Sequence, residues 1–133
     1  MSERVPSTGA LGILMLDTRF PRIVGDIGNA ASFDYPVIYR RMAGVGSGDA
    51  VTAHPDRPRV LAALKANAEA LAAQGAVGIS TSCGFLALYQ DDLAAASPVP
   101  VATSALLLIR QLKGKRIGVI TASARSLTPA HFE

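Results

Sequence analysis

The chain has 133 residues, of which 50% are hydrophobic and 17% charged, which suits one folded domain and excludes a disordered segment. Its apolar runs are too short to cross a bilayer, and its N-terminus lacks the features of a signal peptide. The net charge of +3 is scattered along the chain, and only seven residues are aromatic, so we expect neither nucleic-acid nor membrane binding. A small anionic substrate is the expected partner. The single cysteine fits a reducing compartment, so a cytoplasmic location is expected.

The first half of the chain predicts two strands separated by a long loop. Residues 10–16 are apolar without alternation, which is typical of a strand covered on both faces of a parallel sheet. Residues 19–35 show no period and contain proline and glycines, so an irregular loop is expected, of the length that often carries function. A second strand is predicted over 37–42. The glycines of 44–49 predict a flexible turn with no helix directly after it, and this turn lacks the lysine of a phosphate-binding loop.

The middle of the chain predicts the clearest helix, over residues 57–74. Its apolar residues fall on one face, Asp56 can cap its first turn, and Gly75 suits the left-handed position after its last turn. A short buried strand is predicted next, over 76–81, followed by a helix over 85–96 that ends before a proline.

The last third predicts a strand over 99–102, a helix over 105–112 and a second buried strand over 116–121. Thr128 and Pro129 then resemble the cap and first position of a helix. Strands that alternate with helices predict an α/β fold, a doubly wound parallel sheet flanked by helices.

In such folds, ligands bind beyond the carboxyl ends of the strands. Polar residues directly after the predicted strands are therefore the site candidates: Asp17, Thr18, Thr81, Ser82, Cys83, Gly84, Thr121 and Ser123. Cys83 is the strongest of them, because a helix start beside it would favour thiolate and lower the pKa of the thiol. The backbone N–H groups at that helix start could also hold a substrate carboxylate. The alternative is that Cys83 is a buried structural residue.

The other candidates have competing structural interpretations. For Asp17 the two interpretations are a carboxylate that orients a base and one that caps a loop. For Thr121 and Ser123 they are ligand binding and stabilisation of a turn. The two histidines, His54 and His131, lie far apart in the sequence with no other ligand at metal spacing, so no metal site is expected. A serine–histidine–aspartate triad is not expected either, since no Gly-x-Ser-x-Gly turn occurs.

Four segments together resemble the aspartate/glutamate racemase superfamily. They are Leu-Gly-Ile-Leu-Met-Leu-Asp-Thr-Arg-Phe-Pro at 11–21, Thr-Ser-Cys-Gly-Phe-Leu at 81–86, Val-Pro-Val-Ala-Thr-Ser at 99–104 and Gly-Val-Ile-Thr-Ala-Ser at 118–123. The resemblance implies a cofactor-independent isomerase that acts at the α-carbon of a small amino acid or carboxylic acid. It also implies a flavodoxin-like lobe within a two-lobed fold, with one cysteine in each lobe.

The resemblance assigns roles to individual residues of this chain. Cys83 matches the first catalytic cysteine, and Asp17 matches the aspartate that assists it. Gly84 and Phe85 fall where typical members bind the substrate carboxylate with side chains, so here only their backbone amides can do so. Relatives that decarboxylate or isomerise diacids share the scaffold, so the fold does not fix the substrate.

The resemblance also predicts the domain organisation. Residues 1–112 would form the first lobe, and residues 113–133 the strand and helix start of a second lobe, so the chain reads as truncated. Racemisation needs a base on each face of the α-carbon, so a second lobe is expected to be necessary for turnover. A half fold would expose an apolar face, which predicts a homo-oligomer. The alternative function is a non-catalytic domain that binds small anions or mediates oligomerisation.

Overall fold

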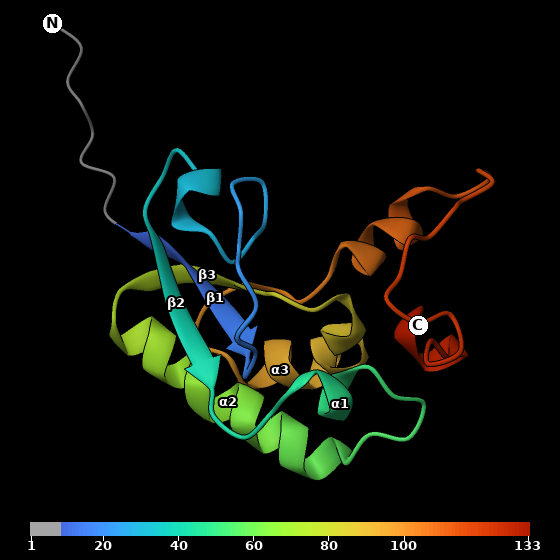
Figure 1. The fold of residues 1–133 in the computed structure, drawn as a ribbon, viewed down its shortest axis with the longest axis horizontal. Helices are drawn as coiled ribbons and strands as arrows, with labels where there is room; N and C mark the ends of the chain where they lie inside the picture. The colour runs from blue at the N-terminus through green and yellow to red at the C-terminus, as the bar shows by residue number, and fades with distance from the viewer. Residues whose placement is uncertain (1–8) are drawn as a thin grey trace, which may run out of the picture.

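A parallel four-stranded sheet organises the computed structural model, which describes residues 9–133 (Figure 1). The strand order is β2-β1-β3-β4, and every neighbouring pair is parallel. The strands are β1 (Ala10–Leu16), β2 (Val37–Met42), β3 (Ala76–Thr81) and β4 (Val101–Ala102). The predicted α/β class and the predicted strands at 10–16, 37–42 and 76–81 are therefore confirmed. The predicted strand at 99–102 forms over two residues only.

Helix α2 (Arg57–Ala73) covers one face of the sheet (Figure 1). Val60, Leu64 and Leu71 face the sheet and are fully buried, which confirms the predicted apolar face. The Asp56 carboxylate accepts the backbone N–H of Arg59, as predicted for a helix cap. Gly75 has φ +102° just after the helix, a conformation that side chains rarely adopt.

The short helix α3 (Gln90–Ala96) packs beside α2 and against β4. It is preceded by a 3-10 helix, η2 (Gly84–Tyr89), so the predicted single helix over 85–96 is half 3-10 and half α. Phe85, Leu86 and Tyr89 are all buried, and this near-continuous burial favours a tight turn against the core over a regular amphipathic helix. The predicted turn over 44–49 also differs, because helix α1 (Ser47–Ala50) begins within it.

Coil covers the opposite face of the sheet at β1 and β2. It contains only a short 3-10 helix, η1 (Ala30–Ser32), which confirms the irregular loop predicted for 19–35. The Tyr39 hydroxyl on β2 donates to the Ile27 carbonyl at 2.8 Å and ties this coil to the sheet. The prediction of helices flanking the sheet therefore holds for one face. On the other face, coil rather than a helix covers β1 and β2.

The end of the chain contains the largest departure from the predicted elements. Residues 116–121 do not form a strand, and the Ile120 side chain is fully exposed. A strand needs a neighbour to pair its backbone groups, and none lies beside this segment in the described residues. The predicted division into residues 1–112 and 113–133, and the predicted self-association, stay predictions.

Two 3-10 helices flank this exposed segment. The first, η3 (Ala105–Gln111), takes the place of the predicted helix over 105–112, with the Ser104 hydroxyl accepting the Leu106 N–H. The second, η4 (Pro129–His131), begins after Thr128 as predicted. The His131 ring is buried edge-on against Phe85, with ring centres 5.4 Å apart, and attaches the end of the chain beside η2. No helix among residues 9–133 is both long and apolar enough to cross a membrane.

Candidate active site

The carboxyl ends of β1, β3 and β4 meet at one edge of the sheet, where the loop that carries Cys83 begins. The Ser82 N–H donates to the Leu14 carbonyl at 2.9 Å, so the pairing of β3 with β1 continues past the end of β3. The Ser82 hydroxyl in turn accepts the Leu16 N–H at 3.3 Å. Cys83 follows in extended conformation and is the residue from which η2 starts. The chain direction therefore changes at the cysteine, which places its half-buried side chain at the sheet edge.

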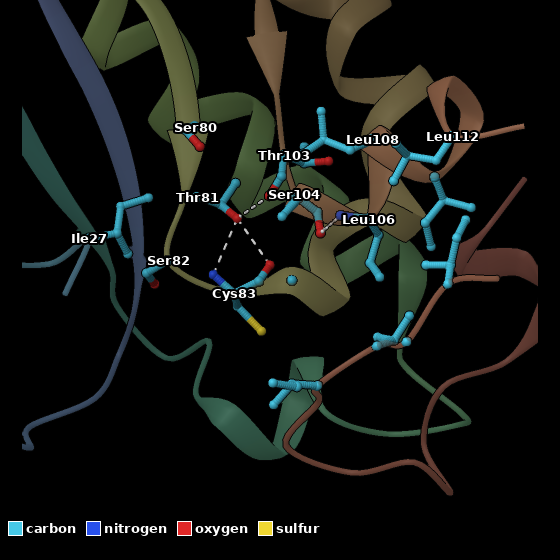
Figure 2. Close-up of a pocket in the computed structure, with 17 residues that line it drawn as sticks. Ile27, Ser80, Thr81, Ser82, Cys83, Thr103, Ser104, Leu106, Leu108 and Leu112 are labelled. Atoms are coloured by element: carbon cyan, nitrogen blue, oxygen red, sulfur yellow. Dashed lines mark hydrogen bonds between the residues drawn. The ribbon is translucent and has the colours of Figure 1, made fainter. Parts of the chain in front are cut away.

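The Cys83 side chain lines a cavity of about 600 Å³ (Figure 2). Hydroxyl side chains from the ends of β3 and β4 form one wall, and apolar side chains from η3 and residues 117–120 form the other. The hydroxyl wall consists of Ser80, Thr81, Ser82, Thr103 and Ser104, and the apolar wall includes Leu106, Leu108, Leu112 and Ile120. Among residues 9–133, no charged side chain lines this cavity. A smaller cavity of about 230 Å³ shares Ser82, Cys83 and Gly84 and adds Phe85 and Thr121.

The predicted site residues separate into two groups in the structure. The first group, around these two cavities, consists of Thr81, Ser82, Cys83, Gly84, Phe85 and Thr121. The other three lie elsewhere. The Asp17 carboxylate accepts a hydrogen bond from the Gly44 N–H at 3.0 Å, and the Thr18 hydroxyl accepts one from the Arg22 guanidinium at 3.0 Å. The Ser123 and Ser126 hydroxyls form a hydrogen bond with each other at 2.9 Å. A catalytic role for Asp17 and ligand binding by Thr18 and Ser123 stay predictions.

Thr18 lines a separate cavity of about 610 Å³ that contains Arg19, Arg22 and Arg41. Arg19 and Arg41 are exposed. Arg22 forms a salt bridge with the Asp26 carboxylate at 3.1 Å and lies over the Phe20 ring. In the described part of the chain, no three His, Cys, Asp or Glu side chains are grouped as metal ligands would be.

The candidate list from the sequence missed Thr103 and Ser104, which lie directly beyond β4 on the cavity wall. The rule that found Cys83 also applies to them, because they follow a strand at the same edge of the sheet. No sequence pattern predicted that apolar side chains of η3 would line the cavity. Their position depends on the path of the chain after β4, which the sequence does not reveal.

The predicted lowering of the pKa of Cys83 is wrong. Burial raises the pKa of the thiol, because a thiolate loses hydration in this half-buried position. Hydrogen bonds from the backbone N–H groups of Phe85 and Leu86 lower the pKa, but by less than burial raises it. The helix that starts here is a 3-10 turn of six residues, which offers a weaker aligned dipole than the α-helix predicted. The resting thiol is therefore favoured over thiolate.

This direction can be measured by alkylation, because Cys83 is the only cysteine in the chain. The iodoacetamide rate should rise with pH around a midpoint above that of free cysteine measured in parallel, since only thiolate reacts. In urea, the midpoint should return to the free-cysteine value. A folded-state midpoint at or below that of free cysteine would contradict the burial argument.

Taken together, the fold and the site define an α/β domain with a half-buried thiol at the carboxyl edge of a parallel sheet. Three relatives align with 90–100% of the chain, and all are named dimethylsulfoniopropionate lyases. Lyase 5 of Emiliania huxleyi (strain CCMP1516) is 32% identical over 139 residues and lyase 7 of that strain 33% over 128, while the lyase of Durusdinium sp. clade D is 30% identical over 128. The chain spans 27%, 36% and 42% of the lengths of these three proteins, respectively. No family model and no solved structure matches the chain.

These relatives correct the function predicted from the sequence. They are named as lyases, so the assignment to the aspartate/glutamate racemases and to the isomerase class is wrong. The physical reason lies in the chemistry that the motif encodes. A thiolate can take a proton from the carbon next to a carboxylate, and that step alone does not decide between racemisation and elimination. What happens to the resulting electron pair depends on the substrate, which the motif does not specify.

Proposed function

We propose that this chain provides the cysteine-bearing part of a lyase that cleaves a short carboxylate by β-elimination, with dimethylsulfoniopropionate as its substrate. The observation that carries the proposal is the Cys83 thiol, which lies between a hydroxyl wall and an apolar wall in an uncharged cavity. The names of the relatives support the choice of substrate.

The proposed reaction begins with thiolate at Cys83, which takes a proton from the carbon next to the substrate carboxylate. The electron pair of that C–H bond forms the carbon–carbon double bond, and the adjacent C–S bond breaks. Its electrons pass to the positively charged sulfur, which departs as neutral dimethyl sulfide and leaves acrylate. The thiol holds the proton until it returns it to water. Because the leaving group departs neutral, no acid is needed to protonate it.

The cavity suits both ends of such a substrate. Ser80, Ser82 and Ser104 offer hydroxyl groups to the carboxylate, and the Gly84 and Phe85 backbone amides lie beside the thiol. The apolar wall, which includes Leu106, can contact the two methyl groups. The substrate carries equal positive and negative charge, so it enters an uncharged cavity without leaving a net buried charge.

The sulfonium group of the substrate would also lower the pKa of Cys83, which burial raises. A positive charge placed within a few ångströms of the sulfur favours thiolate over thiol, in the way that a neighbouring arginine would. The substrate therefore supplies the activating charge that the cavity walls lack. The thiol is neutral while the site is empty and becomes a base when the substrate binds.

Elimination requires fewer catalytic groups than racemisation does. Racemisation needs a second base to return a proton to the opposite face, whereas elimination needs one base on one face. Cys83, the single cysteine of the chain, can supply it. We further propose that the strand order β2-β1-β3-β4 represents the first four strands of a flavodoxin-like lobe. A second lobe would then pack on the exposed apolar residues around Ile120 and close the cavity.

The experiment that tests the function measures gas release. The protein is incubated with dimethylsulfoniopropionate, and dimethyl sulfide and acrylate are measured together by headspace chromatography and liquid chromatography. We expect the two products in equal amounts. The control substrate is 3-(methylsulfanyl)propionate, which has the same carboxylate but a neutral sulfur that is a poor leaving group, and it should give no acrylate. Acrylate from both compounds at similar rates, or from neither, would contradict the proposal.

A further inference from the structure

A chain of hydrogen bonds, buried at its centre, links helix α3 to the loop that carries the thiol. It runs from Gln90 on α3 through Thr103 after β4 to Thr81 at the end of β3, and from there to the backbone of Cys83. From this geometry we infer that Thr81 is a positioning residue, which holds the Cys83 thiol in its reactive orientation. The catalytic meaning of this role rests on the proposed function, but the role itself concerns the thiol alone.

The Thr81 hydroxyl makes contacts on both sides of the cavity edge (Figure 2). It accepts the Cys83 N–H at 3.3 Å, and it donates to the Thr103 carbonyl at 2.6 Å, with the Cys83 carbonyl also within reach at 3.1 Å. Thr81 itself is buried, with 5% of its surface exposed. A single hydroxyl thus joins the cysteine loop to the backbone after β4.

The far end of this connection is held by the partly buried side chain of Gln90. The Gln90 side-chain oxygen accepts both the backbone N–H and the hydroxyl of Thr103, each at 2.8 Å. The Gln90 side-chain N–H donates to the Val101 carbonyl at 2.8 Å. These three bonds fix the backbone after β4, so the carbonyl that receives the Thr81 hydroxyl has little freedom to move.

The position of the Cys83 backbone matters because two neighbouring N–H groups act on its sulfur. The backbone N–H groups of Phe85 and Leu86 lower the pKa of the thiol against the effect of burial. The Leu86 N–H also donates to the Cys83 carbonyl at 3.0 Å. A shift of the cysteine backbone would therefore change this bond as well as the contacts of the two N–H groups with the sulfur. Without the Thr81 hydroxyl, the Cys83 N–H and the Thr103 carbonyl lose a partner in a buried place, and the loop must move to recover one.

Three variants separate positioning from a general effect on the core. Thr81→Val keeps the shape and removes the hydroxyl, and Thr81→Ser keeps the hydroxyl. Thr103→Val removes a buried hydroxyl from the same network but leaves the backbone carbonyl that Thr81 binds. The readout is the pH profile of iodoacetamide alkylation of Cys83, with thermal unfolding measured for each variant to establish that it is folded.

We expect Thr81→Val to raise the alkylation midpoint by about half a pH unit, which lowers the rate near neutral pH about threefold. Thr81→Ser should restore the original profile. Thr103→Val keeps the carbonyl that Thr81 binds and the backbone N–H bond to Gln90, so it should shift the midpoint by much less than Thr81→Val does. A folded Thr81→Val protein with the original profile would overturn the inference, as would an equal shift in Thr103→Val. Alkylation requires no turnover, so the absence of dimethyl sulfide release would reject the proposed function and leave this test intact.

Discussion

Replacing Cys83 with alanine is expected to lower the rate of dimethyl sulfide release by a factor of about 10² to 10⁴, the usual contribution of a positioned general base. Alanine removes the sulfur without adding bulk, so the cavity and its hydroxyl wall should persist. Cys83→Ser should be nearly as slow, because a serine hydroxyl holds its proton far more strongly than a thiol does. The measurement is product formation against time at saturating dimethylsulfoniopropionate.

Substrate binding provides the decisive comparison for these variants. Both should bind the intact substrate, measured by calorimetry, because the carboxylate contacts come from hydroxyls and backbone amides that the substitutions leave in place. Ser97→Ala is a suitable control, since this small polar side chain at the end of α3 bonds only its own loop, at the Val99 carbonyl and N–H. Release by Cys83→Ala within threefold of the unmodified protein would exclude the thiol as the base.

Leu64→Ala should cause the second large effect, a loss of about 2–5 kcal/mol in the free energy of unfolding. Leu64 has no exposed surface and lies in the middle of α2, within the core cluster that the helix forms with the sheet. The substitution leaves a cavity that the surrounding side chains can fill only in part. A loss of this size is a large share of the stability of an ordinary domain.

The loss is measured by urea unfolding followed by far-ultraviolet circular dichroism. Lys65→Ala on the same helix is the matched control, because Lys65 is exposed and alanine is at least as favourable in a helix. The control should change stability by no more than about 0.5 kcal/mol. A loss below about 1 kcal/mol for Leu64→Ala would mean that α2 is not packed on the sheet as described.

The sequence predicted those elements whose pattern is set by burial within the segment itself. The uninterrupted apolar run at 10–16 and the one-sided helix over 57–74 formed where expected, because each satisfies its backbone and covers its apolar residues against immediate neighbours. Residues 116–121 have a strand-like composition, but a strand forms only when another strand lies alongside. Likewise, the mixture of 3-10 and α turns over 84–96 depends on packing against the core, which periodicity does not reveal.

The candidate site was predictable in position but not in chemistry. The edge formed by the carboxyl ends of parallel strands follows from topology, which is why Ser82, Cys83 and Gly84 were found together. The direction of the pKa shift of Cys83 depends on how much water the fold removes, and this cannot be read from neighbouring residues. The proposed lyase chemistry depends on a leaving group that belongs to the substrate, so no residue of the motif reports it.

The central place of β1 in the sheet has a consequence during biosynthesis. This strand is made before the other three strands of the sheet, yet its second neighbour, β3, is made only after α2 is complete. The nascent chain therefore holds an apolar strand with one side unpaired until β3 has been made. Pairing between strands that are far apart in the sequence is slow and leaves apolar surface exposed in the meantime. We therefore expect chaperones to bind the β1 segment.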